Sequence, residues 1–392
     1  MEDALQPANV ALCLGLDAAD AVVAQMIERL TDAVRDPARP GRLSTALLHH
    51  VGAEAFLLAR VSAEVRAART LLETFAGAPA AQRALGDFAV ASVLRGLRGT
   101  LATSGDSYAG SALDGLQLDQ AAADALRLAT AQPAIDAIFD WLSVGGASAP
   151  ASYALSEDHE DIRALFRDFA DAKVAPLAEE IHRDDALLPE SLLSAYAEIG
   201  ALGITIPSEW GGHFIDHRSM AIATEELSRA SLGAGGSVIT RPEIASKALL
   251  AGGSEAQKKA WLPAIAAGKE IVGIAVTEPG AGSDVARLRM AAVPTAGGWL
   301  LTGEKTWCTF AGRASVLLVL ARTGQQDEGA KGLTLFLARK PATKAPDDDR
   351  SFAHEDGRGG SLAGRAIPTV GYRGMHSFTC FFENWFVADD DR

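Results

Sequence analysis

The sequence predicts an α+β protein built from three successive parts: a helical N-terminal extension over residues 1–150, a second helical domain over 151–268, and a β-barrel domain over 269–392. Its 392 residues exceed the roughly 250–300 residues that one hydrophobic core supports. Apolar residues recur at helical spacing as far as Ala266. From Ile271 onward, short apolar runs between turns are typical of strands.

Composition excludes several classes of function. The chain has 36 Lys+Arg against 50 Asp+Glu, a net charge of −14, which argues against nucleic acid as a partner. Cys13, Cys308 and Cys380 are far apart and form no CxxC pair, so neither a disulfide framework nor a zinc site is predicted. Glu2 and Asp3 stand where a signal peptide carries basic residues, and we find no stretch of about 20 apolar residues. The expectation is a cytoplasmic protein without a membrane span.

The N-terminal extension is rich in Ala and Leu. Helices are predicted over Ser44–Phe75, Gln82–Leu97 and Leu116–Leu142, the last with a break at Pro133. Ala102–Gly115 is predicted to be a loop, and Gly145–Pro150 a linker. His49 and His50 point in different directions on a helix, so they are assigned a structural role and no chemistry.

The second part is again helical. Ser156 is predicted to cap a helix whose apolar face includes Leu165 and Phe166, and Pro176 is predicted to end or bend it. Further helices are predicted over Ser191–Ile199, Met220–Arg229, Pro242–Leu250 and Glu255–Ala266.

Six strands are predicted in the third part: Ile271–Thr277, Arg289–Val293, Trp299–Thr302, Ser315–Ala321, Gly332–Arg339 and Phe378–Val387. The turn Pro294–Gly298 joins the second and third as a hairpin. Pro341–Gly360 is charged and becomes Gly-rich, and is predicted to be mobile.

The stretch Val276–Asp284 (VTEPGAGSD) carries the strongest chemical signal. Gly280 and Gly282 can adopt positive φ and let a ligand approach the backbone, while Thr277 and Ser283 add hydroxyl donors. Consecutive N–H groups in such a turn form an anion-binding nest. An ordinary Gly-rich turn is the alternative, and neither a P-loop nor a GxGxxG motif is present.

The stretch Gly303–Gly312 (GEKTWCTFAG) follows the predicted hairpin. Its Trp307, between two threonines, offers a flat apolar wall beside hydroxyl donors, which suits a heteroaromatic ring. A core tryptophan at a strand end is the alternative. Because one hairpin joins this stretch to Val276–Asp284, the two can line one pocket.

These paired motifs resemble the central β-domain of the acyl-CoA dehydrogenases. The pieces around them agree in order: LGITIPSEWGG, EELSRAS and SEAQKKAWLPAIAAGK precede the motifs, and GYRGMHSFTCFFENWFV follows them. The resemblance covers roughly 151–392. It implies a helical domain, a β-barrel domain and a C-terminal four-helix domain, with FAD bound between the last two.

The resemblance implies roles for individual residues. Val276, Thr277, Gly282 and Ser283 would contact FAD or its phosphates, and Ser283 would also reach the pantetheine side of the substrate. Trp307 and Thr309 would border the flavin ring and its N5 edge. Phe310 and Ala311 depart from the family's usual Thr-Asn-Gly, which puts the local wall in doubt.

In the family, a glutamate of the C-terminal helical domain removes the α-proton, and this chain ends at Arg392, where that domain is expected to begin. We therefore assign no catalytic residue and no metal site here; Glu278 and Glu304 are interpreted as loop and turn residues. The remainder is expected as a separate polypeptide, or the chain is a fragment. A homo-oligomer, dimer or tetramer, is expected.

The long extension is similar to that of the methylsuccinyl-CoA dehydrogenase subgroup, which implies oxidation of (2S)-methylsuccinyl-CoA to mesaconyl-CoA with electron-transferring flavoprotein as acceptor. The free carboxylate of such a substrate needs a cation. Arg241, in a predicted loop, is the candidate, with a surface or helix-start arginine as the alternative, and His376 is a weaker one. An acyl-CoA oxidase using O₂ and a non-catalytic scaffold chain are the alternative functions; peroxide formation in air would identify the oxidase.

Overall fold

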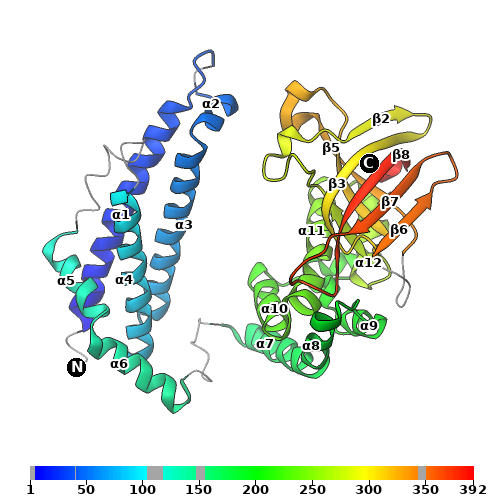
Figure 1. The fold of residues 1–392 in the computed structure, drawn as a ribbon. Helices are drawn as coiled ribbons and strands as arrows, with labels where there is room; N and C mark the ends of the chain where they lie inside the picture. Colours follow the sequence, from blue (N-terminus) through cyan, green and yellow to red (C-terminus); the bar gives the residue numbers. More distant parts are fainter. Residues whose placement is uncertain (1–4, 40, 104–117, 147–154, 343–349) are drawn as a thin grey trace. The chain divides into compact units, whose positions relative to one another are not determined.

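The computed structural model describes residues 5–39, 41–103, 118–146, 155–342 and 350–392. The chain divides into two compact units, Met1–Leu155 and Ser156–Arg392, and each is described by itself. Figure 1 shows the helices of the first unit and the mixed architecture of the second.

The first unit is helical. Its elements are α1 (Leu5–Ala33), α2 (Thr45–His50), α3 (Gly52–Phe75), α4 (Ala80–Thr103), α5 (Gln120–Ala129), α6 (Gln132–Trp141) and the π-turn η1 (Leu142–Gly146). Ser44 caps α2 by accepting the Leu47 N–H, which confirms the predicted start. The single helix predicted over Ser44–Phe75 is wrong, because Val51 leaves helical geometry (φ −116°, ψ 29°) and separates α2 from α3.

The break predicted near Pro133 is confirmed, and α6 begins just before that proline, where a missing N–H costs no hydrogen bond. Most of the predicted loop Ala102–Gly115 and of the predicted linker Gly145–Pro150 lies outside the described residues. The side chain of His49 is likewise outside the description.

Helix α1 corrects the expectation about membrane spans. Between Val10 and Ala33 it is long and apolar enough, by length and composition, to cross a membrane. Core helices pass the same test, and Leu12, Leu16 and Met26 of this helix are buried with side chains of α3, α4 and α5 in one hydrophobic cluster. Within this stretch 39% is buried, and the sequence prediction failed to single the helix out.

The second unit begins with helices. They are α7 (Glu157–Phe169), α8 (Ala175–Asp184), α9 (Glu190–Glu198), α10 (His217–Ala230), α11 (Ser237–Gly252) and α12 (Glu255–Ala266), with π-turns η2 (Ala170–Val174) and η5 (Leu232–Gly236) between some of them. Ser156 caps α7 as predicted. Pro176 bends the chain rather than ending it, because η2 carries the helix into α8. Leu165, predicted to face the core, is exposed.

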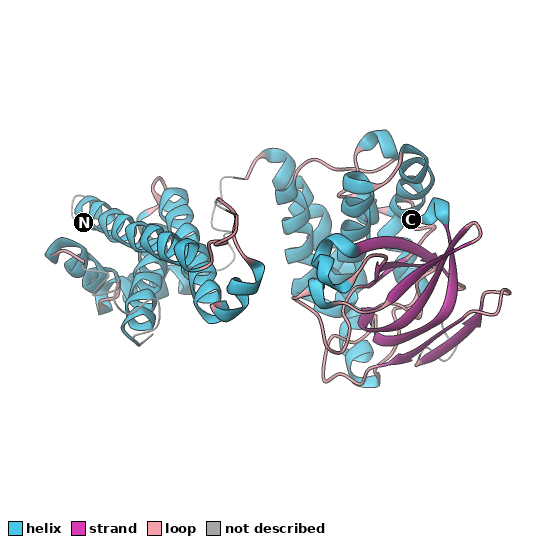
Figure 2. Cartoon of the chain, turned by 90° about the horizontal axis from the view of Figure 1, so that it is seen from above, coloured by secondary structure: helices cyan, strands magenta, loops and turns pink. Residues whose placement is uncertain are grey.

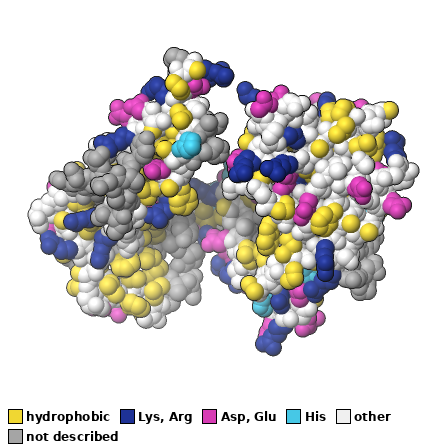
Figure 3. Space-filling view, turned by 45° about the horizontal axis from the view of Figure 1, so that its top comes forward, with side chains coloured by type: hydrophobic (Ala, Val, Ile, Leu, Met, Phe, Trp, Pro, Cys, Tyr) yellow, Lys and Arg dark blue, Asp and Glu magenta, His cyan; other side chains and the backbone are white. Residues whose placement is uncertain are grey.

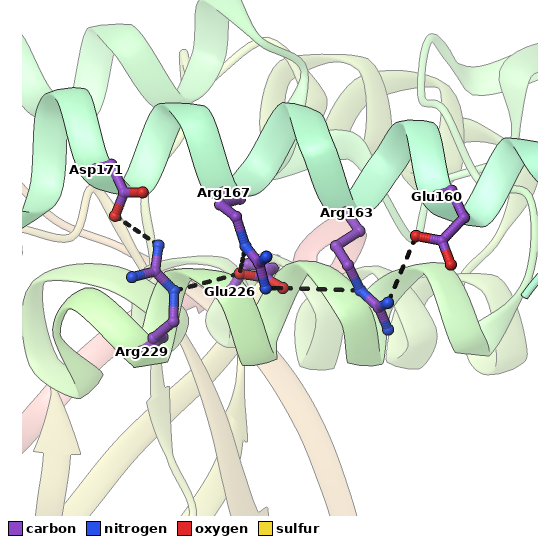
Figure 4. Close-up of polar contacts among 6 residues, drawn as sticks. All are labelled: Glu160, Arg163, Arg167, Asp171, Glu226 and Arg229. Carbon is purple, nitrogen blue, oxygen red and sulfur yellow. Dashed lines mark hydrogen bonds and ion pairs between the residues drawn. The ribbon is translucent and has the colours of Figure 1, made fainter. Parts of the chain in front are cut away.

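A buried carboxylate joins α7 to α10 (Figure 4). Glu226 of α10 accepts hydrogen bonds from Arg167 Nε and Nη2 at 2.9 and 2.7 Å, and Arg229 Nε lies 3.3 Å from it. Arg163 Nε lies 3.8 Å away. Because Glu160 and Asp171 pair with two of these arginines, the cluster is charge-balanced, and it serves as a link between the helices.

One curled sheet follows the helices (Figures 1 and 2). Its strands are β1 (Val272–Ala275), β2 (Ala291–Thr295), β3 (Gly298–Thr309), β4 (Val316–Arg322), β5 (Leu333–Arg339), β6 (Ser351–Glu355), β7 (Ser361–Ala366) and β8 (Ser377–Ala388). They run in the order β1-β4-β2-β3-β8-β7-β6, with β5 paired to β4. The β2–β3 hairpin is confirmed, with Gly297 at positive φ in its turn.

The predicted mobile stretch Pro341–Gly360 is wrong in part, because Ser351–Glu355 forms β6 and pairs with β7. Residues 343–349 lie outside the described part. Side chains of α11 and α12 pack against β1, β4 and β5, and a separate cluster fills the inside of the curl. On the face drawn in Figure 3, acidic and basic side chains are interspersed rather than gathered into one basic surface.

Candidate functional site

The loop after β1 is a tight turn with an open backbone. Glu278 N–H donates to Ala281 O at 2.8 Å and Ala281 N–H returns a bond to Glu278 O at 3.1 Å, so Pro279 and Gly280 form a two-residue turn. Gly280 and Gly282 do not adopt positive φ, which corrects the prediction. A Cβ added at Gly280 would meet nothing within 4 Å, and one at Gly282 only Thr277 Cγ2 at 3.5 Å. A ligand can therefore approach this backbone closely.

A buried ion pair holds the loop in place. Lys305 of β3 is fully buried, and its Nζ donates to Glu278 Oε1 at 2.9 Å and to Val276 O at 2.8 Å. Glu278 also accepts the Arg289 and Met290 N–H groups at 2.8 and 2.9 Å. Burial alone would raise the pKa of Glu278, but these donors together lower it. Sequence reasoning missed Lys305; its only signal was a lysine inside an otherwise strand-like run.

The two predicted motifs are hydrogen-bonded to each other. The backbone N–H of Thr306 donates to the carbonyl oxygen of Thr277 at 2.8 Å. Together with the Lys305 contact to Val276, this bond places the start of the Gly-rich loop directly beside the Trp307 segment. The two motifs therefore lie close enough together to line one pocket, as the sequence predicted.

A β-bulge turns the indole of Trp307 outward. The β3–β8 register shifts between Lys305 and Cys308, and Trp307 adopts φ +58°. Lys305 and Cys308 are fully buried, whereas Trp307 is 57% exposed. A β-bulge changes the direction in which a side chain points. Positive φ at a bulky residue costs free energy, and residues strained in this way cluster at functional sites. The alternative of a core tryptophan is wrong.

The end of β3 is held by the start of β8. Thr309 Oγ1 lies 2.8 Å from Ser377 Oγ, so the serine can donate to the threonine and leave the threonine proton for a ligand. Phe310, at φ +68°, donates its N–H to Met375 O and His376 O. The Phe310 side chain packs in the core of the helical domain, so this departure from the family pattern forms core rather than pocket wall.

The ring of His376 is buried and paired with Asp185. Its Nε2 lies 3.0 Å from Asp185 Oδ1. Asp185 also pairs with Arg350 Nη1 at 2.8 Å and with Arg373 Nε at 3.5 Å. Both Asp185 and His376 adopt positive φ. This cluster joins the end of α8 to the start of β8, and no local sequence pattern indicated Asp185.

Arg241 lies on α11, which corrects its predicted place in a loop. The helix extends past Pro242 toward the N-terminus because η5 already winds the chain before Ser237. The half-buried guanidinium contacts Thr240 Oγ1 and lies 6.0 Å from the Tyr372 ring, in the loop that leads into β8. Arg241 therefore approaches the β8 side of the site, whereas Val276, Thr277, Gly282 and Ser283 lie on the β1 side. In the described residues, no group of His, Cys, Asp and Glu is arranged to hold a metal.

Comparison with known proteins identifies the second unit. Residues 156–269 match the acyl-CoA dehydrogenase N-terminal domain, and residues 273–385 match the acyl-CoA dehydrogenase middle domain. Over residues 156–385, the chain belongs to the acyl-CoA dehydrogenase family. The expected family is thus confirmed, and so is the helical domain followed by a β-domain.

Individual relatives and solved structures match about 60% of this chain. A (2S)-methylsuccinyl-CoA dehydrogenase of Cereibacter sphaeroides is 41% identical over 237 residues, which are 60% of this chain and 42% of that protein. A glutaryl-CoA dehydrogenase of Mycobacterium smegmatis solved in complex with FADH2 superposes with a TM-score of 0.50 at 26% identity, over 60% of this chain and 55% of that chain. A structure described as the electron transferring flavoprotein of Acidaminococcus fermentans gives 0.51 at 25% identity, over 60% and 58%.

The chain spans about half the length of the curated relatives it matches, between 42% and 56% for the first four. The two regions matched by the family models lie within the second unit.

Proposed function

We propose that this chain supplies one wall of the FAD site in a flavoprotein that oxidises (2S)-methylsuccinyl-CoA to mesaconyl-CoA. The 41% identity to a (2S)-methylsuccinyl-CoA dehydrogenase carries the choice of substrate. The similarity to the electron transferring flavoprotein structure supports a flavoprotein as the electron acceptor.

The residues present fit a flavin. The exposed indole of Trp307 offers a flat apolar face, and the backbone over Gly280 and Gly282 is open to a diphosphate. Thr309 can turn its hydroxyl proton toward a ligand, because Ser377 can donate to its oxygen. Bound there, FAD would accept the electrons and hydrogen removed from the β-carbon. Val276, Thr277, Gly282 and Ser283 would hold it from the loop side.

The base that takes the α-proton is proposed to lie outside these residues. Glu278 lies beside the site, but its carboxylate already accepts bonds from Lys305, Arg289 and Met290, and its pKa is lowered. A carboxylate with a lowered pKa and engaged oxygens is a poor general base. Its role is to hold the loop, through Lys305, against β3.

Arg241 is the proposed partner of the free carboxylate of the substrate. Its guanidinium is half-buried and has only neutral oxygen contacts, at Thr240 and Ser237, among the described residues. Tyr372, 6.0 Å away, flanks it from the β8 side. A planar guanidinium can bind a carboxylate with two parallel hydrogen bonds, which a thioester lacking that group cannot accept.

Anaerobic reduction of the flavin tests the proposal. The FAD-loaded protein, assembled with the polypeptide that supplies the base, is mixed with (2S)-methylsuccinyl-CoA, and the bleaching of the visible flavin band is followed. We expect faster bleaching with methylsuccinyl-CoA than with a monocarboxylic thioester such as isovaleryl-CoA. Equal rates would reject the substrate assignment, and absence of bleaching with every thioester would reject dehydrogenation.

A further inference from the structure

A cavity lies beside the Pro279–Gly280 turn. It measures about 340 Å³ and is lined by Glu278–Ala281, by Arg287, Arg289 and Met290, and by Gly303 and Glu304. Gly280, whose open backbone is proposed above for a diphosphate, lines this cavity, whereas none of the side chains proposed above to hold FAD or the acyl group does. Its volume lies within the range of small-molecule sites.

Two arginines line this cavity, and their side chains have no partner among the described residues. Arg287 ends the 3₁₀ turn η6 (Val285–Arg287), and Arg289 follows in the segment that leads into β2. Both are exposed, and the buried Leu288 lies between them. Within the described ranges, neither guanidinium makes a hydrogen bond, an ion pair or a ring contact, so two cations two residues apart are available to a ligand.

Buried charged groups fix the backbone that carries these arginines. Arg322, which is 8% exposed, donates to Ala286 O and Leu288 O at 2.8 Å each. On the other side, the Glu278 carboxylate holds the N–H groups of Arg289 and Met290. The backbone on both sides of each arginine is therefore anchored, which is the rigidity that a pre-organised binding site needs.

The charge in the cavity favours an anion. Of its two carboxylates, Glu278 is neutralised by Lys305 at 2.9 Å. Glu304 is the remaining acid against two arginines. The surplus is positive although the whole chain carries −14. Gly280 has no atom within 4 Å of an added Cβ, so its backbone is open there.

We propose that this cavity binds a phosphate ester, with Arg287 and Arg289 as its ligands. Guanidinium groups are suited to phosphate because each can donate two hydrogen bonds to it. Which molecule carries this phosphate ester rests on the proposed function. That function brings two phosphate-bearing molecules to this domain, the CoA thioester with its nucleotide and FAD with its diphosphate.

Binding measurements on the full chain test the site. Calorimetric titrations use CoA, dephospho-CoA, FAD and inorganic phosphate on four proteins: wild type, Arg287→Ala/Arg289→Ala, Arg287→Lys/Arg289→Lys and Arg365→Ala. Arg365 is an exposed arginine of β7 that does not line the cavity, so it is the matched control for loss of charge. Because the removed arginines are exposed, the melting temperature is expected to stay unchanged.

The double alanine variant is expected to bind one nucleotide at least tenfold more weakly, with partial recovery in the double lysine variant and no change in Arg365→Ala. If the double alanine variant loses affinity for CoA but not for dephospho-CoA, and the wild type binds dephospho-CoA as weakly as the variant binds CoA, the site holds the 3′-phosphate of CoA. If the variant loses affinity equally for CoA and dephospho-CoA, the site holds their diphosphate. A loss confined to FAD assigns it to the flavin diphosphate, and a loss for inorganic phosphate alone confirms a phosphate site without a nucleotide.

Unchanged affinities in the double alanine variant, an equal loss in Arg365→Ala, or no binding of any probe to the wild type would overturn the proposal. Its failure is separable from that of the proposed function. If CoA binding depends on the two arginines while methylsuccinyl-CoA never reduces the flavin, the phosphate site is supported and the proposed reaction is rejected.

Discussion

The carbonyl oxygen of Thr277 accepts the backbone N–H of Thr306 at 2.8 Å, although the two residues belong to separate motifs joined by the β2–β3 hairpin. The bond lies between the loop that follows β1 and the bulge that exposes Trp307. It makes one continuous wall of two segments, and the account of flavin binding depends on it.

Trp307→Ala is expected to weaken FAD binding about tenfold, because stacking on an aromatic ring is worth about 0.5–1.5 kcal/mol and tenfold corresponds to about 1.4 kcal/mol. The free energy of unfolding is expected to change by less than about 0.5 kcal/mol, since the indole is 57% exposed. Flavin fluorescence titration measures the first quantity and urea denaturation the second. Phe381→Ala, which truncates a comparably exposed ring on β8, is the control; an equal loss of affinity in both variants would remove Trp307 from the site.

Arg241→Ala is expected to weaken methylsuccinyl-CoA binding at least tenfold and to leave isovaleryl-CoA binding unchanged, because only the former has a free carboxylate that can lose its partner. Arg241→Lys keeps the charge but not the paired donors, so an intermediate affinity is expected. Equilibrium titration of both thioesters is the measurement. If both affinities change by the same factor, Arg241 does not recognise the carboxylate.

Lys305→Met is expected to lower the free energy of unfolding by about 3–5 kcal/mol, because it leaves the buried Glu278 carboxylate without its cation. The double variant Lys305→Met/Glu278→Gln is expected to lose less than the sum of the two single variants, since neither charge is then buried alone. Urea denaturation of the four proteins completes the cycle. Additive losses would show that the two side chains do not act as a pair.

Lys340 is expected to make the free energy of unfolding depend on pH in the alkaline range. Its buried ammonium group donates only to Gly312 O and Pro341 O among the described residues, and burial lowers its pKa from 10.5 to about 8. Between these values the unfolded chain binds more protons than the folded one, so this group makes the free energy of unfolding rise with pH, by at most about 1.4 kcal/mol per unit. Comparing denaturation of wild type and Lys340→Met at pH 8 and pH 10 isolates the effect. Parallel pH dependence in both would contradict it.

Local patterns were sufficient for much of the fold. The caps at Ser44 and Ser156 and the hairpin turn before Gly298 depend on neighbouring residues, and all three predictions hold. Helix α1 and strands β6 and β7 were missed. Helix α1 carries apolar residues on several faces. Strand β6 lies in a charged stretch where pairing with β7 overrides the composition, and β7, which contains Gly364 and Arg365, is held by pairing with β6 and β8.

At the candidate site, the residues that support the motifs could not be predicted from the sequence. The motif residues were found because they stand close together in the chain, and their assignment to FAD and substrate stays a prediction. Lys305, Asp185 and Ser377 support the site from distant positions, through contacts such as Lys305 with Glu278, 27 residues away. Tertiary pairing of this kind leaves no local pattern. The positive φ of Trp307 likewise depends on the β3–β8 register and not on its neighbours.

Hydrogen–deuterium exchange of the protein with and without FAD shows which backbone segments the flavin protects. We expect slower exchange on FAD binding in two segments together, 276–283 and 306–309, with no comparable change in β6 or in the first unit. Protection of only one of these segments, or protection confined to other parts of the chain, would contradict a flavin wall built from both.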